Sequence, residues 1–217
     1  MLKKIIPILA FFALLFLYSY LTVPNLAWLK TENPRTTAFM QQYKGKAPLQ
    51  FYWVSYTSIS PYLKQAVIFA EDANFFNHHG VDWNAIWEAF KENWEEREFK
   101  RGGSTITQQL SKNLFLSPSK NPLRKMKELF ITLALERELS KQRILELYLN
   151  VVEWGEGIYG AEAAAQHYFH ISAGSLSPYQ AAQLAAMLPS PRYFEKNLTQ
   201  SRYLEQRAIK ILTRMSY

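Results

Sequence analysis

The sequence contains no cysteine and only two aspartates, and both shortages restrict its chemistry. Without cysteine the chain has no disulfide, no thiol nucleophile and no thiolate metal ligand. The aspartates, Asp72 and Asp82, are too far apart to form the Asp-x-Asp pair of nucleotide-sugar transferases. Histidine is also scarce, and the adjacent His78 and His79 cannot both face one metal ion on a regular element. We therefore expect no histidine metal site.

Two short motifs lack the partners that would give them a function. Ser117-Pro118-Ser119-Lys120 matches the Ser-x-x-Lys of penicillin-binding acyl enzymes, but no Lys-Thr-Gly follows it. Gly102-Gly103-Ser104 is not a phosphate-binding P-loop, because no Gly-Lys-Ser/Thr follows it. The sequence thus gives no support to either class.

A long apolar run is present at the N-terminus. No residue of Ile5–Leu29 is charged, and Ile5–Val23 is almost entirely apolar. Because about 20 residues suffice to cross a bilayer as a helix, this run is long enough to be a transmembrane anchor. Lys3 and Lys4 precede the run, so the positive-inside rule places the N-terminus in the cytoplasm and the remainder outside. The alternative is a cleavable signal peptide, but the run ends in Tyr18–Thr22 rather than in a small-x-small site.

Most of the remaining chain has the spacing of helices. Ser60-Pro61, Asn121-Pro122, Ser140 and Ser177-Pro178 each precede apolar residues at helical intervals, as helix N-termini do. Phe51–Ser58 is aromatic and β-branched and is predicted to be a short strand. The sequence therefore predicts a mainly α fold with small β elements at most.

These patterns divide the chain into three segments. We predict a cytoplasmic tip and transmembrane anchor at 1–29, a polar stalk at 30–47 and one folded domain at 48–217. The net charge is +7, which on a membrane-tethered domain favours anionic lipid headgroups or a phosphate-bearing substrate. A nucleic-acid partner is not expected outside the cytoplasm.

The segment that follows Gly102-Gly103 is the most informative part of the chain. The glycines permit a tight turn, after which Ser104 is predicted to cap a helix. On that helix Thr105, Gln108, Gln109 and Lys112 form a polar stripe with one cation and no acid. Such a helix N-terminus suits a large anionic or polyhydroxylated ligand. The alternative is an ordinary amphipathic helix that begins after two glycines.

Glu71 is a candidate general base or acid. Its spacing from Leu63 and Val67 places it on the apolar face of its helix, near the C-terminal end. A carboxylate among apolar neighbours has a raised pKa, as proton transfer near neutral pH requires. The alternative is a residue at the edge of that face that reaches water or pairs with an arginine.

Glu128 is the second acidic candidate. It lies one turn after Arg124 on a helix that is apolar over much of its circumference, and Lys125 and Lys127 are close in sequence. The alternative is an intrahelical ion pair between Arg124 and Glu128, which at this spacing stabilises a helix by roughly a few tenths of a kcal/mol. Two carboxylates beside a cationic stripe would suit glycosyl transfer with a phosphate leaving group.

With these segments in order, the chain closely resembles the peptidoglycan glycosyltransferases of glycosyltransferase family 51. It looks most like the monofunctional, membrane-anchored, biosynthetic form of Gram-negative bacteria. The resemblance covers about residues 50–215 and rests on five motifs in the expected order. They are Glu71–Asp82; Gly102–Asn113; Arg124–Glu128 with Ala134–Glu136; Arg143–Asn150 with Gly157–Ala165; and Leu184–Pro189.

The resemblance implies a lysozyme-like helical domain that polymerises lipid II at the outer face of the inner membrane. Glu71 would be the general base on the acceptor's GlcNAc 4-hydroxyl, and a β-1,4 bond would form with inversion. Glu128 would assist at the donor pyrophosphate, with a divalent cation such as Mg²⁺ or Mn²⁺. Ser104, Gln108, Gln109 and Lys112 would contact the pyrophosphate and sugar.

The resemblance also implies the partners: lipid II, the nascent glycan chain, membrane lipids and the division or elongation machinery. Where the family usually has a pyrophosphate-binding arginine, this chain has Lys120, which keeps the charge but loses bidentate geometry. Arg124 is a nearby cation that could share the role. The alternatives to a polymerase are a lysozyme-like glycan-cleaving enzyme and an inactive membrane-anchored scaffold.

Overall fold

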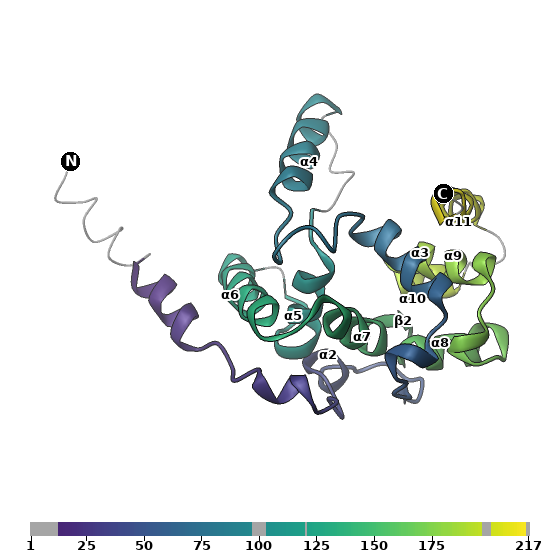
Figure 1. Cartoon of the computed structure of the whole chain (residues 1–217), viewed down its shortest axis with the longest axis horizontal. Coiled ribbons are helices and arrows are strands. Elements are labelled where there is room, and N and C mark those ends of the chain that lie inside the picture. The colour runs from purple at the N-terminus through teal and green to yellow at the C-terminus, as the bar shows by residue number, and fades with distance from the viewer. Residues whose placement is uncertain (1–12, 97–102, 120, 197–200, 216–217) are drawn as a thin grey trace.

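The computed structural model describes residues 13–96, 103–119, 121–196 and 201–215. The prediction of a mainly α fold is confirmed (Figure 1). The α-helices are α2 (Ala38–Gln41), α3 (Pro61–Glu71), α4 (Trp83–Glu96), α5 (Ile106–Phe115), α6 (Pro122–Glu138), α7 (Lys141–Val151), α8 (Ala161–Phe169), α9 (Pro178–Met187), α10 (Pro191–Glu195) and α11 (Arg202–Met215). Short 3₁₀ helices are η1 (Ala27–Lys30), η2 (Tyr56–Ser58) and η3 (Ala173–Ser175).

The four predicted helix starts are confirmed by their caps. The side chains of Ser60 and Asn121 accept backbone N–H bonds at the starts of α3 and α6, and Ser140 does so at α7. Ser177 forms a reciprocal capping box with Gln180 at the start of α9. Each cap satisfies N–H groups that a helix leaves without an internal partner.

A small sheet lies where the sequence predicted one short strand. Strand β1 is only Gln50–Phe51, and the rest of the predicted strand includes η2, so the prediction over Phe51–Ser58 is largely wrong. β1 pairs in parallel with β3 (Ile158–Tyr159), which pairs antiparallel with β2 (Glu153–Gly155). Aromatic and β-branched residues suit a strand, but here most of them pack irregularly against the helices.

Two groups of helices build the core that positions the candidate site. Helix α3 packs against α9 and α11, and α5 packs against α6 and α7 (Figure 1). Fully buried side chains such as Leu63, Ile106 and Tyr148 belong to one continuous apolar cluster. Helix α4 projects away from this body in Figure 1.

The N-terminal part of the chain contacts the domain. Residues 13–21 are helical, and the ring of Phe16 meets that of Phe130 on α6 at a centroid distance of 4.7 Å. In the part of the chain that the structure describes, no helix combines the length and apolarity that crossing a bilayer requires. The first part of the predicted anchor, residues 1–12, lies outside the described residues.

The segment predicted as a stalk is also packed. Met40 on α2 is buried where α2 packs on α5, and just before the stalk Leu26 and Leu29, at the end of the predicted anchor, belong to the core cluster. Arg143 fixes this segment by donating to the backbone oxygens of Leu29 and Glu32. The packed core therefore reaches further toward the N-terminus than the predicted boundary at residue 48, because apolar side chains there find partners on the domain.

Candidate active site

A buried aspartate joins the end of α3 to the start of α5. Asp72 accepts the backbone N–H of Ile106 at 3.0 Å and contacts His78 Nε2 at 2.9 Å. The hydroxyl of Thr105 donates to the backbone oxygen of Gly80 at 2.7 Å. These bonds hold the first turn of α5 beside the loop that follows Glu71.

The cap of α5 differs from the prediction. Thr105, not Ser104, is the N-cap residue, and it forms a capping box with Gln108. The Thr-x-x-Gln spacing is the signature that favours Thr105, since Ser104 has a threonine at the corresponding position. The Oε1 of Gln108 is thereby engaged inside the cap, where it accepts the N–H of Thr105.

Glu71 is the last residue of α3 and its side chain is 12% exposed. Its Oε2 accepts from Gln109 Nε2 at 2.8 Å, and its Oε1 lies 3.6 Å from Arg207 Nη2 on α11. Burial raises the pKa of Glu71, against the opposing effects of Gln109 and Arg207. The carboxyl group is thus shielded from solvent yet oriented by donors on two other helices, as a proton acceptor requires.

Glu128 lies under a pair of cations. Its side chain is 3% exposed, and its two oxygens accept from Arg124 and Lys125. Lys125 Nζ also donates to Ser104 Oγ at 3.0 Å, which ties the turn before α5 to α6. The predicted Arg124–Glu128 pair is therefore present, and it is part of a larger group that carries net positive charge.

Lys112 on α5 is a half-buried cation that is influenced electrostatically by both carboxylates. Burial lowers the pKa of Lys112, while the charges of Glu128 and, more weakly, Glu71 act in the opposite direction. Arg124 and Lys125 reinforce the effect of burial, so three cations share this region with Glu128. The contacts place α5 and the turn before it between the two carboxylates. Gln109 on α5 donates to Glu71, and Lys125, which pairs with Glu128, donates to Ser104 just before α5.

Comparison with known proteins agrees with this geometry. A family model described as Transglycosylase matches residues 37–216. The chain belongs to the transglycosylase family. It is accordingly an enzyme of the glycosyltransferase class, and the resemblance drawn from the five motifs is confirmed.

The curated relatives match over nearly their whole length. A biosynthetic peptidoglycan transglycosylase of Methylobacillus flagellatus is 49% identical over 211 residues, which cover 94% of this chain and 92% of the relative. Proteins of the same name from Nitrosospira multiformis and Nitrosomonas eutropha are 48% and 47% identical. These alignments cover 96% of this chain in both cases, and 93% and 88% of the relatives.

The donor set of this transglycosylase does not fit a metal held by the protein alone. Glu128 is surrounded by cations, and both of its oxygens are engaged by them. Among the residues that the structure describes, no group of three or more His, Cys, Asp or Glu side chains could bind a metal ion. The region favours an anion, and a divalent cation would need the ligand's own oxygens to complete its shell.

Sequence reasoning noted Lys125 near Glu128 without assigning it to the site, although a spacing of three residues brings helix side chains together. It missed Tyr148 and Arg207. These residues lie on α7 and the distant α11, and no local signal connects them with Glu71. Lys120, a predicted ligand, lies outside the described residues.

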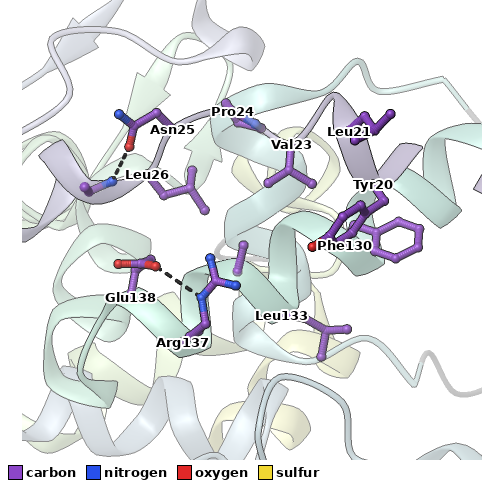
Figure 2. Close-up of a pocket in the computed structure, with 12 residues that line it drawn as sticks. Tyr20, Leu21, Val23, Pro24, Asn25, Leu26, Phe130, Leu133, Arg137 and Glu138 are labelled. Atoms are coloured by element: carbon purple, nitrogen blue, oxygen red, sulfur yellow. Dashed lines mark hydrogen bonds and ion pairs between the residues drawn. The ribbon is translucent and has the colours of Figure 1, made fainter. Parts of the chain in front are cut away.

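A separate cavity of about 700 Å³ lies away from these residues. Its lining includes Tyr20 and Leu21 together with Phe130 and Leu133 of α6, and Figure 2 shows the rings of Tyr20 and Phe130 beside each other. Arg137 and Glu138 form an ion pair at its edge. None of the residues that line it belongs to the group around Glu71 and Glu128, so this cavity is separate from the candidate site.

Proposed function

We propose that this protein is a peptidoglycan glycan-chain polymerase that uses lipid II as its substrate. It transfers the growing chain from undecaprenyl pyrophosphate to the GlcNAc 4-hydroxyl of lipid II. The reaction forms a β-1,4 bond with inversion at the donor sugar. The observation that carries the proposal is a shielded carboxyl group, Glu71, and a cationic group around Glu128, both in contact with α5 or the turn before it.

On the acceptor side, Glu71 is the general base. The acceptor oxygen attacks C1 of the donor MurNAc while its proton passes to a carboxylate oxygen of Glu71. The donor's bond between C1 and the pyrophosphate oxygen breaks, and the leaving group keeps the electron pair. A raised pKa suits this step, because the best general base titrates near the working pH.

On the donor side, cations stabilise the pyrophosphate as its negative charge grows. Lys112, Arg124 and Lys125 supply that charge, and Glu128 orients Arg124 and Lys125 through its two oxygens. Fixed cations in a partly dry site stabilise a leaving anion more strongly than water does. Ser104, Gln108 and Lys120 remain proposed contacts to the sugar or pyrophosphate, and no step depends on the predicted divalent cation.

The names of the relatives support synthesis rather than degradation, since all three are called biosynthetic. To test this, purified protein is incubated with lipid II and, in a separate reaction, with finished peptidoglycan sacculi. We expect long glycan strands from lipid II and no soluble fragments from sacculi. Soluble muropeptides released from sacculi would instead support the glycan-cleaving alternative, and inactivity with both substrates would support a scaffold.

We also propose that residues 5–23 anchor the protein in the inner membrane with the catalytic domain in the periplasm. The absence of cysteine makes this testable, because a single introduced thiol is then unique. In cells with a permeabilised outer membrane, a membrane-impermeant maleimide should label Thr213→Cys, an exposed position on α11. Labelling only after the inner membrane is lysed would refute this orientation. Labelling of the same position in sealed inside-out vesicles, which expose the cytoplasmic face, would also refute it.

A further inference from the structure

A buried tyrosine orients the amide group that faces Glu71. Tyr148 on α7 is fully buried, and its hydroxyl donates to Gln109 Oε1 at 2.9 Å. At its other end the same amide donates from Nε2 to Glu71 Oε2 at 2.8 Å. The three side chains come from α7, α5 and α3, so the contact is built by tertiary packing.

The order of donors in this chain of hydrogen bonds has a chemical consequence. A glutamine amide has one accepting end and one donating end, and either could face Glu71. Burial raises the pKa of the Tyr148 hydroxyl well above its ordinary value, so the hydroxyl keeps its proton and needs an acceptor. The amide oxygen meets that need, which leaves the amide NH₂ to face Glu71.

We propose that Tyr148 is a positioning residue that fixes the Gln109 amide with its NH₂ toward Glu71, and so keeps Glu71 ready to accept a proton. The ionised carboxylate of Glu71 accepts a hydrogen bond from the amide NH₂ group. When the carboxyl group is protonated, its O–H finds no acceptor on that NH₂ group. The flipped amide would offer an oxygen instead and would stabilise the protonated, inactive form. The inference rests on the proposed role of Glu71 as general base.

Other charged groups also face Glu71, and they stay constant when Tyr148 changes. Arg207 on α11 and Lys112 on α5 favour the carboxylate, and the neighbouring Asp72 opposes it. Helix α9, which packs on α3, contributes no charged residue. A difference between wild type and Tyr148→Phe therefore reports on the amide.

The test is the pH dependence of kcat/KM for polymerisation by Tyr148→Phe. Without the hydroxyl the amide is free to flip, so we expect the acid limb of the profile to move to higher pH by about one unit. The rate on that limb should fall about tenfold, with a much smaller change on the plateau. Tyr168→Phe is the matched control, because Tyr168 donates to the backbone oxygen of Trp154 and its loss should leave the limb in place.

Two further measurements make the result decisive. Gln109→Leu removes the donor itself and should also raise the acid limb, and adding Tyr148→Phe to it should cause no further shift. A ¹³C titration of the Glu71 carboxyl, assigned by comparison with Glu71→Gln, should show the same displacement without any substrate. If Tyr148→Phe does not fold, Gln109→Leu can still overturn the proposal, because an unmoved acid limb in that variant would show that the amide has no effect on Glu71 to be positioned.

The outcomes separate this inference from the proposed function. An unmoved limb and an unmoved carboxyl titration in these variants would overturn the positioning role, even with polymerisation intact. A rate lowered equally at every pH would also overturn it, because that result indicates only a structural role. Failure of the wild type to polymerise lipid II would refute the proposed function, while the ¹³C titration would still judge the hydrogen-bond arrangement.

Discussion

Replacing Glu71 by glutamine is expected to lower the rate of glycan polymerisation at least about 100-fold, since a positioned general base contributes that much or more. The amide has nearly the shape of the carboxyl group but cannot accept the acceptor's proton. The measurement is the initial rate of strand formation from lipid II at saturating substrate. Glu205→Gln makes the same change at an exposed position on α11 and should keep the wild-type rate.

The same variant should remain folded, and it should lack a pH dependence of stability that Glu71 gives the wild type. Because burial raises the pKa of Glu71 above its ordinary value of 4.5, the unfolded chain ionises first as the pH rises. The wild type therefore loses stability as the pH rises from 4.5 through the folded pKa, whereas Glu71→Gln has no such titration. The unfolding temperature of the variant should gain on that of the wild type across this window. Unchanged turnover in a folded Glu71→Gln protein would refute the assignment of the base.

Replacing Lys112 by alanine is expected to lower kcat/KM by roughly 10- to 100-fold, the loss of one charge-assisted hydrogen bond to the donor. Lys112 is a half-buried cation that senses both Glu128 and Glu71, so solvent cannot replace its charge. Most of the loss should appear as a higher KM for lipid II, because the cation holds the pyrophosphate before and during transfer. Initial rates over a range of lipid II concentrations measure both constants.

The control for this variant is Lys210→Ala, which removes an exposed lysine of α11 and lowers the net charge equally. It should leave both constants unchanged, which separates local binding from a general effect of surface charge. Normal activity of Lys112→Ala at every lipid II concentration would count against its role at the pyrophosphate.

Local signals in the sequence were sufficient for most of the helices. Ser60, Asn121, Ser140 and Ser177 cap the helices that they were predicted to begin. The strand predicted over Phe51–Ser58 failed because its aromatic residues pack on helices that lie far away in sequence. Local composition fixes caps and faces, but pairing partners are set by the whole fold.

Some residues of the candidate site carry signals in the sequence, but their connections do not. The apolar face around Glu71 and the polar stripe on α5 were both visible in the sequence. Helical spacing also places Tyr148 on the buried face of α7, yet nothing local shows that its hydroxyl meets Gln109. In the sequence, Arg207 has the spacing of a surface residue on an amphipathic helix. Only the packing of α11 on α3 and α9 brings it into the candidate site.

The contact between α11 and α3 has a consequence for how activity is acquired. Arg207 donates to the backbone oxygen of Ala70 and faces Glu71, although 137 positions separate Arg207 from Ala70. During synthesis Glu71, the proposed base, emerges from the ribosome well before Arg207. Its carboxyl group therefore lacks this guanidinium neighbour until α11 has docked on α3, and we expect the proposed reaction centre to be complete only then.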